Sequence, residues 1–367
     1  VREVRQNTFN PDEQADLDVV MPPLRDTNKI FYFNKWILGG IRSLNANQTI
    51  VLSSLSDKDV NGQVQDLLTV AKMNLANGRG QEARGFLSLA LDLLPELSKS
   101  PEYLALRGAA NAIAGKHELA LRLFLQPSLA NIEELDYWRA YTLASLEDWQ
   151  QAIDVLPADF GVVADYPLAI QERIGVTLAE VALRNGDVKK AEALLSILNR
   201  RREEVRDTTI NGVRYLFGEA FRQRGELDRA KQIWLPLSKG EDDYYRARAG
   251  LALTIIEIEQ SQISKETAID RLEGLRYAWR GDELEAKVNF MLGKMYLEEK
   301  RYLKAFTLMR DAGTMSPGTE ISREIDREMK QQFLDLLLND KELTPIDAVQ
   351  VYEEFKELVP RGTMGNK

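Results

Sequence analysis

One spacing recurs along this chain: a glycine or alanine is followed twelve positions later by an alanine. The pairs are Ala71/Ala83, Gly108/Ala120, Ala140/Ala152, Ala179/Ala191, Gly218/Ala230 and Gly293/Ala305. A looser copy, near Gly250 and Ala268, has extra residues around Gln260–Ser264. The second alanines of successive copies are separated by 32 to 39 residues. A repeat of this length indicates stacked units that bury their apolar faces only against one another.

Each unit reads as two helices joined by a tight turn. Four units carry a glycine seven residues after the small residue, at Gly78, Gly115, Gly186 and Gly225. In the stretch Asn289–Pro317, Gly293 lies in the middle of the first predicted helix, where glycine costs about 1 kcal/mol relative to alanine. That cost is tolerable where a neighbouring helix lies close by. Ala305 and Ala312 share one face of the second helix, so small residues are predicted to line the contact.

The pattern resembles the tetratricopeptide repeat, a degenerate helix–turn–helix unit of about 34 residues. The unit Val64–Leu97 matches at Ala71, Gly78, Ala83, Leu87, Ala90 and Pro95. The unit Ala286–Thr319 has Lys300 where the turn glycine is expected, and the middle units match more weakly. Over roughly Val64 to Thr319, the resemblance implies a mainly α fold: a right-handed superhelical solenoid of about seven repeats. It also implies a concave surface that holds a partner protein or peptide.

The apolar periodicity predicts seven helix pairs between residues 62 and 313. Their approximate bounds are 62–77 with 80–94, 101–114 with 117–125, 132–146 with 149–156, 168–185 with 188–205, 209–224 with 227–238, 242–260 with 264–278, and 283–299 with 302–313.

The chain is predicted to have three parts: an irregular or β-prone segment at 1–61, a repeat solenoid at 62–319, and C-terminal capping helices with the start of a further segment at 320–367. The β-prone runs are Asp18–Met21, Ile30–Phe33 and Thr49–Leu55. The first part is interpreted either as a small β module or as an irregular arm packed on the first helices. A terminal solenoid unit needs a helix to cover its core, which the apolar stripe of 320–339 supplies.

Charge and composition narrow the class of partner. The net charge of −9 disfavours general binding to a nucleic-acid backbone. No apolar run reaches the roughly 18 residues that a membrane-spanning helix needs. The absence of cysteine excludes disulfides and thiolate sites, and slightly favours a cell envelope or periplasm over cytoplasm. Because the sequence begins at Val1, we interpret it as a fragment of a larger, bacterial-style protein.

No pattern of catalytic residues is present. His117 is the single histidine, which excludes a two-histidine metal motif, and it lies at a predicted turn. Gly115-Lys116 lacks the glycine five positions earlier that a P-loop needs, since Ala110 stands there. The sequence therefore predicts a protein that is not an enzyme, with no cofactor and no metal.

The concave surface remains as the candidate site. The register of the tetratricopeptide family implies which positions of the first helices face inward. In this chain many of these positions carry aromatic or basic residues, which would suit an extended acidic segment or a C-terminal segment of a partner. Tyrosine and arginine are enriched at binding hot spots. The predicted groove residues are Tyr137, Tyr141, Arg173, Arg184, Tyr215, Arg222, Lys287, Phe290 and Lys294.

The leading hypothesis is a non-catalytic protein–protein interaction scaffold. The alternative is a substrate-recognition or regulatory solenoid of an enzyme whose catalytic domain lies outside this chain. A third possibility is a structural solenoid that assembles into homo-oligomers. The lysine and asparagine clamp with which chaperone-binding family members hold a terminal carboxylate is not evident, which argues against a co-chaperone role.

Overall fold

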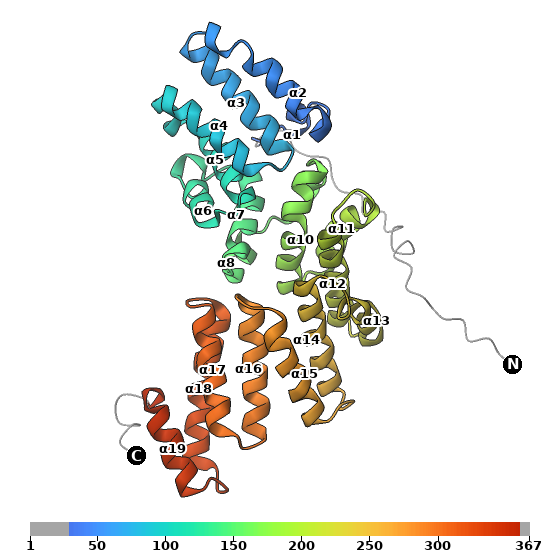
Figure 1. Cartoon of the computed structure of the whole chain (residues 1–367), viewed down its shortest axis with the longest axis vertical. Coiled ribbons are helices and arrows are strands. Elements are labelled where there is room, and N and C mark those ends of the chain that lie inside the picture. Colours follow the sequence, from blue (N-terminus) through green and yellow to red (C-terminus); the bar gives the residue numbers. More distant parts are fainter. Residues whose placement is uncertain (1–28, 360–367) are drawn as a thin grey trace, which may run out of the picture. The chain divides into compact units, whose positions relative to one another are not determined.

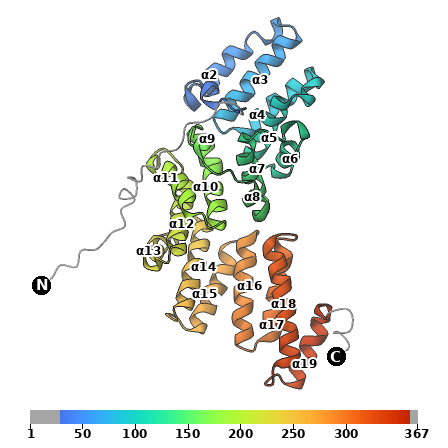
Figure 2. The same cartoon turned by 180° about the vertical axis from the view of Figure 1, so that it is seen from behind.

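Helices account for almost all regular structure in this chain. The computed structural model describes residues 29–359, and no strand occurs among them (Figures 1 and 2). The chain divides into two compact units, Val1–Glu226 and Leu227–Lys367, and each is described by itself. Whether 1–61, 62–319 and 320–367 behave as separate segments stays a prediction.

The first unit contains α1 to α12. The bounds are α1 (Phe33–Trp36), α2 (Gly40–Leu52), α3 (Val60–Ala76), α4 (Gly80–Leu93), α5 (Pro101–Ile113), α6 (His117–Phe124), α7 (Glu134–Ser145), α8 (Trp149–Val155), α9 (Gly161–Ala164), α10 (Leu168–Arg184), α11 (Val188–Arg200) and α12 (Asp207–Gln223). Short 3-10 turns at Leu55–Asp57, Pro95–Lys99 and Pro127–Leu129 connect some of them.

The second unit contains α13 to α19. The bounds are α13 (Leu227–Leu237), α14 (Asp243–Glu259), α15 (Lys265–Ala278), α16 (Glu283–Glu298), α17 (Tyr302–Met315), α18 (Glu320–Asn339) and α19 (Pro345–Glu354), with a 3-10 turn at Lys356–Leu358. All the predicted helix pairs are present, so the prediction of a helical-repeat fold is confirmed. The division between the units falls in the turn between α12 and α13.

One backbone turn ends the first helix of every repeat. Its central residue has a positive φ, between 52° and 78°, and is Gly78, Gly115, Glu147, Gly186, Gly225, Ser261 or Lys300. The N–H of Gly186 bonds the carbonyl of Leu183 at 2.9 Å, and the N–H of Asp187 bonds that of Ala182 at 2.9 Å. This pair of bonds is the Schellman motif, which satisfies carbonyls left over at a helix end. The other six turns repeat it, including the three without glycine.

Small residues let the paired helices approach closely. A Cβ atom added to Gly293 would lie 2.8 Å from the Cγ of Met309 and 3.1 Å from the carbonyl oxygen of Ala305. One added to Gly108 would lie 2.5 Å from the ring of Phe124. All three distances are below normal van der Waals contact, so a side chain at either position would force its neighbours to move. The close approach predicted at Gly293 is confirmed.

The C-terminal helices complete the core of the second unit. Phe306 of α17 contacts Phe333 of α18 at 5.9 Å and Phe355 at 5.4 Å between ring centroids. All three rings are buried in one cluster. Thr344 caps α19, because its hydroxyl accepts the N–H of Asp347 at 3.2 Å. Helix α18 thus covers the apolar faces of α16 and α17.

The β-prone runs do not form strands where the structure describes them. Ile30–Tyr32 is non-helical, Phe33 begins α1, and Thr49–Leu52 ends α2. Asp18–Met21 lies outside the described residues. Of the two interpretations of the N-terminal part, the structure agrees with an arm packed on the first helices, because α1 and α2 both contact α3.

A substitution at Ser261 tests the cost of a side chain in the turn. Ser261 is exposed and has a φ of 52°, a region that disfavours residues with a Cβ by about 1–2 kcal/mol. Ser261→Gly should raise the free energy of unfolding by about 0.5–1 kcal/mol, since the more flexible unfolded chain offsets part of the gain. Ser261→Ala keeps the strain and should give no increase. Denaturant titration of the three proteins measures the difference.

A second substitution tests the helix contact at Gly293. Gly293→Ala should lower the free energy of unfolding, because overpacking costs about 1–3 kcal/mol and alanine recovers only about 1 kcal/mol of helix propensity. Gly274→Ala in α15 is the matched control, since a Cβ there meets no atom within 4 Å. It should stabilise the protein. Equal stabilisation by both substitutions, measured by thermal unfolding, would contradict the packing role of Gly293.

Candidate peptide-binding faces

The first unit holds a segment of its own chain against its first helices. We call residues Lys29–Trp36 the N-terminal arm. Phe31 and Phe33 of the arm are completely or almost completely buried, and their rings stack at 5.2 Å. Phe31 lies 5.3 Å from the ring of Trp138 in α7, and Phe33 meets the edge of Tyr166 at 4.9 Å. The arm is therefore anchored by its two phenylalanines against Trp138 and Tyr166, which we call the aromatic cradle.

The carboxylate of Glu134, the first residue of α7, binds the main chain of the arm. One oxygen, Oε2, accepts the N–H groups of Ile30 and of Phe31, the latter at 2.9 Å. The other, Oε1, accepts the hydroxyl of Tyr166 at 2.7 Å, and that hydroxyl accepts the indole N–H of Trp138 at 3.3 Å. Hydrogen bonds to an ionised acceptor are stronger than neutral ones. Glu134 thus joins arm and cradle in one buried network.

Burial sets the acidity of this network. Desolvation raises the pKa of Glu134 above its usual value, although the hydrogen bonds from Phe31, Ile30 and Tyr166 and the charge of Lys29 oppose the rise. Burial and the adjacent Glu134 carboxylate raise the pKa of Tyr166 well above its usual value. The tyrosine therefore stays protonated and donates its hydrogen bond over the whole physiological pH range.

The rest of the arm reaches two further elements. The side-chain amide of Asn34 donates to the carbonyl of Asp165 at 3.1 Å, just after α9. The ammonium of Lys72 in α3 lies 5.6 Å from the ring centroid of Trp36. The arm thus contacts α3, α7 and the segment between α9 and α10.

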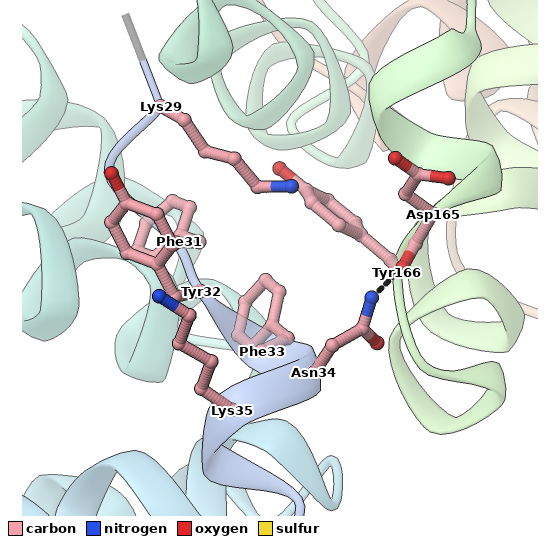
Figure 3. Close-up of a pocket in the computed structure, with 8 residues that line it drawn as sticks. All are labelled: Lys29, Phe31, Tyr32, Phe33, Asn34, Lys35, Asp165 and Tyr166. Carbon is pink, nitrogen blue, oxygen red and sulfur yellow. Dashed lines mark hydrogen bonds between the residues drawn. The ribbon is translucent and has the colours of Figure 1, made fainter. Parts of the chain in front are cut away.

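A cavity of about 220 Å³ opens beside the arm (Figure 3). Figure 3 shows the side chain of Lys29 extending towards Tyr166, and the side chain of Asn34 hydrogen-bonded to the main chain at Asp165. The cavity is lined by Lys29, Phe31, Tyr32, Phe33, Asn34, Lys35, Asp165 and Tyr166. The arm contributes the cations of Lys29 and Lys35 to the cavity, and the repeats contribute the carboxylate of Asp165. The two sides of the cavity therefore have opposite charge.

Two of the predicted groove residues are buried. The hydroxyl of Tyr137 donates to the carbonyl of Asp159 at 2.8 Å, and burial raises its pKa. Tyr141 packs edge-on against His117 at 5.7 Å between ring centroids, and burial raises its pKa as well. The expectation that both tyrosines face an open groove is wrong, because both side chains pack within the repeats.

The predicted arginines are more accessible. Arg173 of α10 and Arg222 of α12 are exposed, and Arg222 pairs with Glu219 at 2.7 Å. Arg184 is half-buried, stacks 3.6 Å from the ring centroid of Trp149 and pairs with Glu180 at 3.1 Å. Tyr215 of α12 is half-buried. A basic face therefore follows α10 and α12, with its arginines partly neutralised by neighbouring carboxylates.

The predicted residues of the second unit lie on α16. Phe290 is buried in the core cluster that includes Phe306, so its expected place in an open groove is wrong. Lys294 lies 5.4 Å from the ring centroid of Phe290 and pairs with Glu328 at 2.9 Å. Lys287 pairs with Glu283 at 2.7 Å. Both lysines are half-buried and neutralised by carboxylates of their own unit.

His117 and Asp242 both make contacts that stabilise the structure. His117 is half-buried, its Nδ1 has no hydrogen-bond partner, and burial lowers its pKa. Asp242 caps α14 by accepting the N–H of Tyr245 at 3.1 Å. Among residues 29–359, no three histidine, cysteine, aspartate or glutamate side chains are placed to hold a metal ion. None of the helices in that range is long and apolar enough to span a bilayer.

The sequence did not single out Glu134 or the arm as a site. Glu134 occupies an inward-facing position in the register of the third repeat, but the emphasis on tyrosine and arginine passed over it. The aromatic residues Tyr32, Phe33 and Trp36, which are close together in the sequence, were the other available signal.

Comparison with known proteins finds similarity only among solved structures. No family model and no curated protein matches the sequence. A solved tetratricopeptide repeat protein from Parabacteroides merdae has 14% identity and a TM-score of 0.46, over 72% of this chain and 98% of that one. Human IFIT1, solved as a dimer with PPP-AAAA, has 15% identity and a TM-score of 0.46, over 89% of this chain and 80% of that one. The complex of Naa15/Naa10 bound to HypK-THB has 13% identity and a TM-score of 0.32, over 90% of this chain and 52% of that one.

Substitution of Glu134 tests the main-chain contact. Glu134→Ala should lower the free energy of unfolding by at least about 1–3 kcal/mol, because the N–H groups of Ile30 and Phe31 lose their acceptor. Glu134→Gln keeps one acceptor oxygen and should cost less. Denaturant titration at neutral pH measures both changes, and an alanine variant as stable as the wild type would contradict the role of the carboxylate.

The pH dependence of the same variants tests the raised pKa. Since folding raises the pKa of Glu134, the folded state binds more protons than the unfolded state in the window between the usual value of 4.5 and the raised value. The contribution of Glu134 to the free energy of unfolding therefore grows as the pH falls through this window, and it is lost as the pH rises. The stability of the wild type relative to Glu134→Gln should increase from pH 7 towards pH 4.5. A constant difference would contradict the raised pKa.

Proposed function

We propose that this chain is a non-catalytic interaction scaffold that binds a short segment of a partner protein against the first helices of its repeats. The observation that carries the proposal is the arm: the first unit already holds a peptide segment in this way. Phe31 and Phe33 fill the aromatic cradle, and Glu134 accepts two consecutive main-chain N–H groups.

The chemistry of this face suits peptide recognition. Hydrogen bonds to the main chain give affinity that does not depend on the bound sequence, whereas pockets for individual side chains give selectivity. Glu134 provides the first kind of contact, and Trp138 with Tyr166 provides the second. Large rigid aromatic groups are the anchors that contribute most at such interfaces.

The non-catalytic part of the proposal rests on the surroundings of His117, the single histidine. Its ring packs edge-on against Tyr141. A general base needs a position within hydrogen-bonding reach of a substrate proton in an open site. The half-buried environment of the single histidine does not suit that role.

The exposed arginines of α10 and α12 extend the same proposal. Arg173 and Arg222 lie on first helices that follow α7 in the first unit. Their positive charge suits acidic residues of a partner. The aromatic cradle lies beside the carboxylates of Glu134 and Asp165 and therefore suits aromatic and basic residues. Because the exposed Arg222–Glu219 pair contributes only about 0–1 kcal/mol to stability, Arg222 can be replaced without unfolding the protein.

A crosslinking experiment identifies the partner and tests the face. A photo-crosslinking residue at position 173 or 222 of the full chain, expressed in its native cell, should capture a partner that is then purified. The double variant Arg173→Glu/Arg222→Glu should bind this partner about tenfold more weakly, which corresponds to about 1.4 kcal/mol.

Arg122→Glu is the control for this experiment. Arg122 is an exposed arginine on α6, the second helix of its repeat, and its reversal should leave the affinity unchanged. The proposal for this face fails if the double variant and the control bind the partner equally well in isothermal titration calorimetry.

A further inference from the structure

We propose that the N-terminal arm is an internal ligand of the first unit, and that a partner segment reaches this face by displacing the arm. The inference rests on the proposed function and names both the class of partner segment and the way its binding is controlled. The expected segment carries two aromatic side chains separated by one residue, with lysine or arginine beside them.

The arm is held differently from the helices of the repeats. In the first unit, the paired helices α3 with α4, α5 with α6, α7 with α8 and α10 with α11 pack against each other and against the next pair. The arm instead has a non-helical part, Lys29–Tyr32, followed by the single helical turn α1. Its contacts to the repeats include the two buried phenylalanines, the Glu134 hydrogen bonds, the Asn34 amide and the ring of Trp36 under the Lys72 ammonium. The arm can therefore leave its face without breaking a helix pair.

A hinge connects the arm to α2. Leu38, Gly39 and Gly40 follow one another with φ values of 38°, 82° and 70°. Positive φ is strained for leucine, and Leu38 is exposed, so burial of its side chain does not compensate the strain. Gly40 has open space around it. Release of the arm lets Leu38 return to an ordinary conformation while α2 stays in place against α3.

The cradle determines which segment can replace the arm. Removing Phe31 and Phe33 exposes an apolar aromatic surface made by Trp138 and Tyr166, so a competing segment must supply two rings at the same spacing. It must also present two consecutive N–H groups to Glu134. Asp165 and Glu134 lie on the repeat side, and Lys29 and Lys35 lie on the arm side. An acidic segment would be repelled here, in contrast to the acidic ligand predicted for the groove as a whole.

A labelled synthetic peptide of residues 29–38 serves as the probe. In the wild-type chain the arm competes with the peptide at high effective concentration. The double variant Phe31→Ala/Phe33→Ala weakens the arm and leaves the cradle intact. By fluorescence anisotropy, this variant should bind the peptide at least about tenfold more tightly than the wild type. Adding Glu134→Ala should remove the gain, and a peptide with both phenylalanines replaced by alanine should not bind.

The proposal is overturned if the double variant retains its helical circular dichroism and binds the peptide no better than the wild type. If the double variant does not fold, hydrogen exchange on the wild-type chain tests the proposal instead. Local release of the arm should make the amides of Ile30 and Phe31 exchange at least about tenfold faster than those in the middle of α7. Exchange of both sets at one rate would show that the arm opens only with global unfolding, which also overturns the proposal.

These results are separable from those of the crosslinking experiment. Loss of partner binding in Arg173→Glu/Arg222→Glu together with a failed peptide experiment would leave the scaffold function standing without the displacement mechanism. Unchanged partner binding in that variant would reject the arginine face, whatever the peptide does.

Discussion

Close contact between the two helices of a hairpin is the constraint on which every repeat depends. At Gly293 and Gly108 the neighbouring side chain occupies the space that a Cβ would need. The alanines of the second helices, such as Ala83, Ala191 and Ala305, are completely buried at the same kind of contact. Small residues are thus fixed by packing, and the larger residues between them are left to determine what the surface binds.

The helix pairs were predictable because their determinants are local. The pair predicted at 168–185 and 188–205 is found at Leu168–Arg184 and Val188–Arg200. Gly186 between them supplies the positive φ, and Asp187 caps the second helix by accepting the N–H of Lys190. Each of these signals lies within a few residues of the feature it specifies. The same turn without glycine, at Glu147, Ser261 and Lys300, shows that tertiary packing can impose the conformation where the residue does not favour it.

The contacts of the N-terminal arm were less predictable because they join residues that are distant in sequence. Ile30 and Phe31 lie more than a hundred residues before Glu134, which binds them. No periodicity connects such positions. The burial of Tyr137 has the same origin, since Asp159 and Phe160, just before α9, pack against it. The register of the repeat correctly predicts which helix carries a residue. It does not predict which other segment of the chain packs over that side chain.

The paired N–H contact at Glu134 has a consequence for the sequences that this face can accept. A carboxylate that receives two successive main-chain N–H groups recognises the backbone rather than a side chain, so the hydrogen bonds themselves do not select the residue at either place. Proline is the exception, because it carries no N–H and would leave the buried carboxylate short of a donor. Under the proposed function, the face therefore tolerates side-chain variation at the place of Ile30, but it excludes the proline-rich segments that many other peptide-binding grooves select.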